Sequence, residues 1–178
     1  MVLVALLAFG AVSCETPNEP VDKPTPEVKP EDGKPVVLED FTVTLTALHS
    51  GDVSLNIEPE NKEMKYWYSL QLPEDMPETD EEILAADLDY LKYVADYYGM
   101  SLSELLSTEL KAGDLEWRYV GLEPNTEYVL YMYGIGIEGN ALTGVNKLTF
   151  KTTKVMQLDC TFDILPGDNI TANSFSVT

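Results

Sequence analysis

Carboxylates are the side chains of this sequence with the greatest capacity for chemistry. Between positions 74 and 82 the sequence places six of them: Glu74, Asp75, Glu78, Asp80, Glu81 and Glu82. Carboxylate oxygens are preferred ligands of Ca²⁺, but these residues lack the regular alternation of a calcium-binding loop. Acidic residues are also ordinary at the start of a helix, where they complement the helix dipole. We therefore expect no metal and no cofactor at this cluster.

Other catalytic chemistry has few candidates. His49 is the single histidine, which makes a His-based metal centre or catalytic triad hard to build from this chain alone. Asp87 and Asp89 form a close carboxylate pair, but such pairs are too common in this sequence to indicate glycoside hydrolysis. The sequence contains no Gly-rich phosphate loop, HExxH, CxxC or GxSxG motif. We predict that the chain is not an enzyme.

The composition describes a strongly acidic protein of ordinary domain size. The chain has 178 residues, with 11 Lys and Arg against 31 Asp and Glu, and a formal net charge of −20. Its length suits one domain with tails. A surface this acidic repels phosphate backbones, so we expect no nucleic-acid partner. The two cysteines, Cys14 and Cys160, lie at opposite ends of the chain and do not suggest a disulfide framework.

The amino terminus has the features of an export signal. Met1 to Ser13 is apolar throughout, too short for a membrane-spanning helix and of the length of a signal-peptide core. Ala11-Val12-Ser13 then precedes Cys14, which resembles the lipobox of bacterial lipoproteins and implies lipidation of Cys14. Two departures are Ala at the usual Leu position and the absence of Lys or Arg before the apolar run. The alternatives are a secretory signal cleaved nearby or a buried apolar segment.

Residues 15–38 are expected to be a tether. This stretch is acidic and holds six of the 11 prolines: Pro17, Pro20, Pro24, Pro26, Pro30 and Pro35. Such a composition cannot bury a core and favours extended polyproline II, at ~3.1 Å per residue. Its first 21 residues would reach roughly 65 Å, enough to hold a folded domain away from a membrane.

Strict alternation of apolar and polar residues predicts β-strands in the following body. Phe41, Val43 and Leu45 share one face of the first strand. Similar patterns occur over 53–57, 64–72, 115–120, 128–133 and 148–153. In the strand at 64–72, the larger apolar set should face the core, which leaves Trp67 on the opposite side. His49 falls in a turn and is expected to be a solvated loop residue.

Between residues 78 and 112 the pattern changes to a helical period. Thr79 to Glu82 and Ser101 to Glu104 are capping boxes that predict two helix starts. The first helix has an apolar stripe at Leu84, Leu88, Leu91, Ala95 and Tyr98 and ends at Gly99. The second continues through Leu102, Leu105, Leu106 and Leu110. We therefore expect a helical hairpin between the strands at 64–72 and 115–120.

The turn before the strand at 128–133 carries the most specific signal of the sequence. Gly121 precedes Leu122, Pro124, Thr126 and Tyr128, which follow one another at every second position. A tyrosine near the start of strand F can return its hydroxyl to the backbone upstream, forming a tyrosine corner. The spacing resembles fibronectin type III-like domains. Over residues 39–154 this resemblance implies a mainly β, Ig-like antiparallel β-sandwich with the α-helical hairpin inserted between strands C and E.

Three aromatic residues form a candidate binding patch. Strands C and F are neighbours in such a sandwich, so Trp67, Tyr131 and Tyr133 should lie together on the face away from the core. The patch is then either a ligand platform, on which rings stack against sugars or peptide side chains, or a surface covered by the helical hairpin. Because the leucine stripe of the helices must bury against something, we favour the covered arrangement.

Residues 155–178 resemble the start of a second, truncated repeat. Phe162 and Ile164 alternate, a turn follows, and Phe175 and Val177 alternate again, as in the strands at 41–47 and 53–57. This similarity indicates a tandem array, of which the chain holds one closed unit. The second unit lacks its later strands and is expected to be incomplete.

The order of these features resembles the surface lipoproteins of Bacteroidetes. That resemblance implies an acidic module anchored by lipid in the outer membrane or at the cell surface. We expect a non-catalytic role in binding or adhesion, with a glycan or protein as the possible ligand. The alternatives are a spacer, or an accessory domain of a glycan-degrading enzyme whose catalytic part is absent from this chain.

Overall fold

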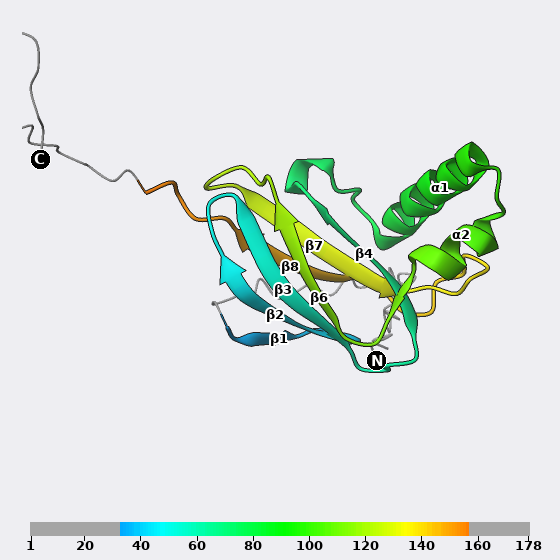
Figure 1. Cartoon of the computed structure of the whole chain (residues 1–178), viewed down its shortest axis with the longest axis horizontal. Helices are drawn as coiled ribbons and strands as arrows, with labels where there is room; N and C mark the ends of the chain where they lie inside the picture. The colour runs from blue at the N-terminus through cyan, green and yellow to red at the C-terminus, as the bar shows by residue number, and fades with distance from the viewer. Residues whose placement is uncertain (1–32, 157–178) are drawn as a thin grey trace, which may run out of the picture.

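The computed structural model describes residues 33–156 as two antiparallel β-sheets and two α-helices (Figure 1). The first sheet has the order β1-β2-β3-β6, with strands Pro35–Val37, Phe41–Leu48, Asp52–Pro59 and Leu115–Val120. The second has the order β5-β4-β7-β8, with strands Lys111–Ala112, Lys65–Gln71, Glu127–Gly134 and Asn146–Lys151. The fold is therefore mainly β, and its two facing sheets are those of a β-sandwich.

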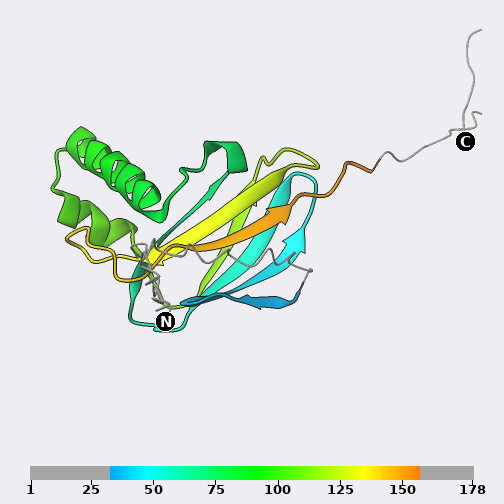
Figure 2. The same cartoon turned by 180° about the vertical axis from the view of Figure 1, so that it is seen from behind.

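The core lies between the inner faces of the two sheets. Alternate residues of β2 and β3 are buried and meet across the strand pair, as Val43 meets Ile57 and Leu45 meets Leu55. The second sheet contributes Tyr66 and Met132 from the neighbouring strands β4 and β7. The inward faces predicted from alternation are therefore confirmed for these strands. Figure 2 shows the same sandwich from behind, where β8 lies beside β7.

The turn between β6 and β7 contains the corner predicted from the sequence. The backbone N–H of Glu123 donates a 2.9 Å hydrogen bond to the hydroxyl oxygen of Tyr128. The hydroxyl of Thr126 donates to the carbonyl of Pro124 at 3.1 Å, and Leu122 packs on the core. Asn125 has a φ of 54°, a left-handed conformation that Asn tolerates better than most residues. These contacts fix the direction in which β7 enters the second sheet.

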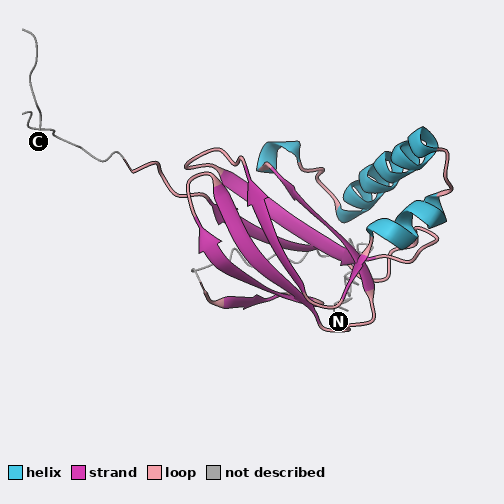
Figure 3. Cartoon of the chain, in the orientation of Figure 1, coloured by secondary structure: helices cyan, strands magenta, loops and turns pink. Residues whose placement is uncertain are grey.

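Two α-helices, drawn in cyan in Figure 3, follow β4 in the sequence and precede β5. They are α1, Asp80–Tyr98, and α2, Leu102–Glu109, and a short 3₁₀ turn, η1, at Pro73–Asp75 comes before them. Both predicted capping boxes are present, at Thr79 and at Ser101. Gly99 ends α1 in a left-handed conformation with a φ of 66°, as its position predicts. The local signals therefore set the helix bounds.

The buried face of α1 differs from the predicted leucine stripe. Its buried residues are Ile83, Asp87, Leu91 and Ala95, whereas Leu84 and Leu88 are only partly buried. Tyr98, which the stripe included, is exposed. The prediction was wrong here because it followed apolar residues alone. An aspartate one turn after Ile83 interrupts that pattern, although it lies on the same face.

Two short strands change the expected boundaries. Pro35–Val37 was expected to belong to the tether, but it pairs with β2 as β1 and buries Val36. Lys111–Ala112 pairs with β4 as β5, so a strand lies between the helices and β6. The predictions for Cys14, for the tether up to residue 32 and for the repeat from residue 157 onward concern residues outside those that the structure describes. Of the expected repeat, only Val155 and Met156 are described, and both are exposed.

Candidate binding surface

The predicted aromatic patch lies beneath the helices. Tyr131 and Tyr133 on β7 are 1% and 0% exposed, and Trp67 on β4 packs with them against the helical layer. Ile83 and Leu106 belong to the same apolar cluster. The rings are therefore not accessible to a ligand in this structure. Of the two arrangements considered for the patch, the covered one describes the molecule, because the apolar faces of α1 and α2 bury against this side of the sheet.

A buried carboxylate lies where α1 meets the second sheet. The hydroxyl of Tyr131 donates to Oδ1 of Asp87 at 2.9 Å, and the hydroxyl of Tyr133 donates to Oδ2 at 3.0 Å. Gln71 donates from Nε2 to the Tyr131 hydroxyl oxygen at 3.3 Å. Each carboxylate oxygen of Asp87 thus accepts one tyrosine hydroxyl. This network was missed in the sequence, where Asp87 was considered only as half of a carboxylate pair.

Burial controls the protonation of this network. Loss of solvent raises the pKa of Asp87, while the hydrogen bonds from Tyr131 and Tyr133 act in the opposite direction. The nearby indole N–H of Trp67 also lowers the pKa of Asp87. Trp67 Nε1 is buried, and it has no hydrogen-bond partner of normal geometry among the described residues. Burial raises the pKa of both tyrosines, and the charge on Asp87 adds to that effect. The hydroxyls therefore stay protonated as donors, and the network joins α1 to the sheet.

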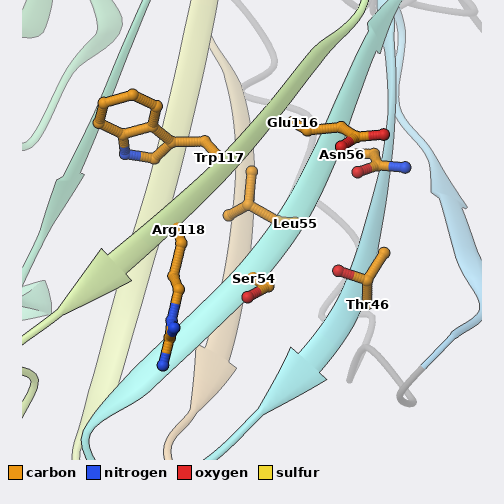
Figure 4. Close-up of a pocket in the computed structure, with 7 residues that line it drawn as sticks. All are labelled: Thr46, Ser54, Leu55, Asn56, Glu116, Trp117 and Arg118. Carbon is orange, nitrogen blue, oxygen red and sulfur yellow. The ribbon is translucent and has the colours of Figure 1, made fainter.

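An open hollow of about 410 Å³ lies over the first sheet (Figure 4). It is lined by Thr46, Ser54, Leu55, Asn56, Glu116, Trp117 and Arg118. Arg118 is already engaged, because its Nη2 lies 3.2 Å from Oδ1 of Asp52. The Trp117 ring extends away from Ser54 and Thr46 in the figure and packs edge-on against the ring of Tyr68. Arg118 and Trp117 therefore have structural partners, and no ligand is assigned to the hollow.

Asp52 and His49 contact each other beside Arg118, at one end of the same face of the sheet. His49 Nδ1 lies 3.1 Å from Oδ1 of Asp52. The hydrogen bond from His49 is the main cause that holds the pKa of Asp52 below its usual range. Loss of solvent opposes it, and the charge of Arg118 lowers the pKa further. His49 is exposed in the turn between β2 and β3, as its sequence position predicts.

The outer face of α1 carries a row of exposed tyrosines. Tyr90, Tyr93 and Tyr97 are 57%, 68% and 74% exposed. Their spacing of three and four residues places them on one side of the helix. Tyr98 continues the exposed aromatic surface at the end of the helix, and its ring meets that of Tyr97 edge-on at 5.2 Å. We call Tyr90, Tyr93 and Tyr97 the tyrosine row.

Carboxylates lie beside the tyrosine row. Glu82, Asp89 and Asp96 are exposed and follow one another at intervals of seven residues, which is close to two helical turns. They therefore form a line along α1 next to the tyrosines. Lys92 lies 3.4 Å from Asp89 and is the one cation of α1. The outer face of the helix thus combines aromatic rings with negative charge.

Two carboxylates of the acidic cluster, Asp80 and Glu82, make structural contacts at the start of α1. Glu82 accepts the backbone N–H of Thr79 in the capping box, and Asp80 pairs with Lys147 at 2.7 Å. Within residues 33–156, no group of three or more His, Cys, Asp or Glu side chains is arranged to hold a metal ion. In the same part of the chain, no helix combines the length and apolar character needed to cross a membrane.

Comparison with known proteins does not extend this description. No family model matches the chain, and no curated protein matches it. The described residues define a class by structure alone: a mainly β protein with two antiparallel sheets, one of which is covered by two helices. The exposed feature that needs a functional explanation is the tyrosine row on α1.

Proposed function

We propose that this chain is a non-catalytic binding or adhesion module of the bacterial envelope. The observation that carries the proposal is the tyrosine row on α1. Three large rings exposed side by side contribute little to folding, since apolar surface stabilises the fold when it is removed from water. Tyrosine is enriched at protein interfaces, where its ring provides contact area and its hydroxyl provides a hydrogen bond. The tyrosine row is therefore the proposed contact surface.

The proposed domain type is a fibronectin type III-like sandwich with a helical hairpin inserted between strands C and E. In that assignment β2, β3 and β6 are strands A, B and E, and β4, β7 and β8 are strands C, F and G. The observed sheet orders group the strands in this way, as expected for Ig-like sandwiches. The hydrogen bond between Glu123 and Tyr128 supports the same assignment.

The proposed location follows from the amino-terminal sequence. A lipid on Cys14 would tether the chain to the outer membrane or cell surface, as the lipobox-like sequence and the proline-rich stretch suggest. Lipid anchoring contributes ~0.8 kcal/mol per buried CH₂, so stable attachment needs more than one acyl chain. The order of anchor, tether and sandwich supports the proposed relation to surface lipoproteins of Bacteroidetes.

A ligand array on the purified chain tests the binding role. The wild-type chain is applied to immobilised glycans and bacterial and host surface proteins, beside a variant with Tyr90→Ser, Tyr93→Ser and Tyr97→Ser. We expect the wild type to bind a subset of targets and the variant to lose that binding. Silence of the wild type across the array would overturn the binding role and support a spacer. Equal binding by both proteins would show that the contact surface lies elsewhere.

A further inference from the structure

We propose that the outer face of α1 binds a basic polypeptide segment. Lysine and arginine side chains of the partner would stack on the tyrosine row and pair with the carboxylates beside it. This inference rests on the proposed binding role and names the chemical class of the partner.

The spacing of the rings suits a partner in the form of a chain. Tyr90, Tyr93 and Tyr97 cover two turns of α1, so successive rings lie about one helical turn, or roughly 5 Å, apart along the axis. The face of a tyrosine ring attracts an ammonium or guanidinium group placed within about 6 Å of its centre. A basic segment lying along the helix could therefore engage several rings with successive cationic side chains.

Charge complementarity selects a basic partner over other occupants. From Asp80 to Glu109 the helical layer has one cation, Lys92, against seven carboxylates besides the buried Asp87: Asp80, Glu81, Glu82, Asp89, Asp96, Glu104 and Glu109. Such a surface repels nucleic acids and also a second copy of this chain, whose formal net charge is −20. A neutral glycan would use the rings but gain nothing from the carboxylates. A basic polypeptide uses both features.

The rest of the fold keeps the outer face of α1 ordered before a partner binds. Capping boxes fix the starts of both helices at Thr79 and Ser101. The hydrogen bonds from Tyr131 and Tyr133 to Asp87 fix the opposite side of α1 on the sheet. The tyrosines therefore project from a helix that is already ordered, which reduces the entropy lost on association.

Binding of a labelled peptide of alternating arginine and glycine tests the proposal. Fluorescence anisotropy at physiological salt compares the wild-type chain with the variant that combines Tyr90→Ser, Tyr93→Ser and Tyr97→Ser. The variant keeps every charge of the wild type, so attraction that depends only on net charge is unchanged. Because three cation–π contacts are lost, we expect binding that is weaker by about tenfold or more. Unchanged binding would overturn the proposal.

Two variants of equal charge test the role of the carboxylates. Asp89→Asn with Asp96→Asn removes two charges beside the tyrosine row. Glu58→Gln with Glu60→Gln removes two exposed charges, one in β3 of the other sheet and one directly after the end of that strand. We expect the first pair to weaken peptide binding and the second to leave it nearly unchanged. Equal losses would show that the peptide senses only the overall charge, which overturns the proposal.

The outcomes separate this inference from the proposed binding role. If the array finds a glycan or acidic protein whose binding requires the tyrosine row, the basic partner is wrong and the binding role stands. If the wild type binds no target on the array and does not bind the peptide, both the binding role and the basic partner are wrong. Circular dichroism and thermal unfolding check that each variant is folded. Should the triple variant unfold, Tyr97→Ser alone, at the most exposed ring of the row, is expected to weaken peptide binding, and unchanged binding would overturn the proposal.

Discussion

Asp87 is the residue that ties the helical layer to the sandwich. It is buried, and no cation pairs with it among the residues that the structure describes. A buried carboxylate without compensation is strongly destabilising. Here the hydroxyls of Tyr131 and Tyr133 each satisfy one of its oxygens. These two hydrogen bonds, from neighbouring outward positions of β7, therefore join α1 to one place on the sheet.

The raised pKa of Asp87 predicts a specific pH dependence. Its pKa lies above the ordinary value of 3.8 because of burial, so the folded chain holds this proton more tightly than the unfolded chain. The stability that this proton contributes is therefore fully present at pH values below the pKa of Asp87 in the unfolded chain. It is lost as the pH rises through the pKa of Asp87 in the folded chain. Relative to the variant Asp87→Asn, the free energy of unfolding of the wild type should increase as pH falls from neutrality towards about 4.

Urea unfolding at several pH values measures this difference. The control is Asp89→Asn, at an exposed position two residues away that takes no part in the hydrogen bonds between Asp87, Tyr131 and Tyr133. Its difference from the wild type should change much less over the same pH range. If the wild type and Asp87→Asn keep a constant difference in unfolding free energy, Asp87 does not titrate as its burial predicts.

Tyr128 allows a second prediction at the scale of one residue. Replacing Tyr128 with Phe removes the acceptor of the Glu123 N–H and keeps the buried ring. We expect a loss of about 1 kcal/mol in unfolding free energy, the net contribution of one hydrogen bond. Chemical denaturation measures the loss, with Tyr98→Phe at an exposed ring as the control. If Tyr128→Phe and the wild type had equal unfolding free energies, the hydrogen bond between Glu123 and Tyr128 would not stabilise the protein.

At the scale of elements, the end of α1 gives a matched pair of substitutions. Gly99 adopts a φ of +66° with nothing near its missing Cβ, whereas Gly144 has equal space and no positive φ. Gly99→Ala forces an alanine into the left-handed region and should destabilise the protein by about 1 kcal/mol. Gly144→Ala should be neutral or slightly stabilising. Thermal unfolding compares the two, and equal effects would contradict the importance of the left-handed cap.

Most regular elements could be predicted because their signals are local. Alternation in β2 and β3, two capping boxes and the corner sequence each specify structure within a few residues. The strands β1 and β5 were missed because three and two residues are too few to show a period of two. Val36 gives no pattern of its own, and its pairing with β2 becomes evident only in the folded sheet.

The candidate surface was harder to predict for a different reason. The sequence placed Trp67, Tyr131 and Tyr133 on one face, and the alternative that the helices cover them was favoured on grounds of burial. The tyrosine row itself was not identified, although its helical spacing is visible. Its exposure depends on the orientation of α1. That orientation follows from the burial of Ile83, Leu91 and Ala95 together with the contact of Asp87 with β7, which no local pattern reveals.

At the scale of the whole molecule, the negative charge predicts an effect of salt. A formal net charge of −20 makes the compact state repel itself. Raising NaCl to about 0.15 M shortens the Debye length to about 8 Å and weakens that repulsion. We expect the Tm at neutral pH to rise with salt over this range. A falling Tm would show that ion pairs such as Lys147–Asp80 outweigh the repulsion.

The proposed anchor also belongs to this scale, because it sets the place in which the acidic sandwich works. Cys14 follows an apolar run and Ala11-Val12-Ser13, so a lipoprotein pathway should attach acyl chains to its thiol and its new amino group. In a bacterial host that processes lipoproteins, we expect the wild type to take up an alkyne-labelled fatty acid and to enter the detergent phase. Cys14→Ala should lose both properties, because the acceptor thiol is gone. Cys160→Ala changes the other cysteine and should retain both; labelling that survives Cys14→Ala, or that disappears in Cys160→Ala, would show that the anchor is not at Cys14.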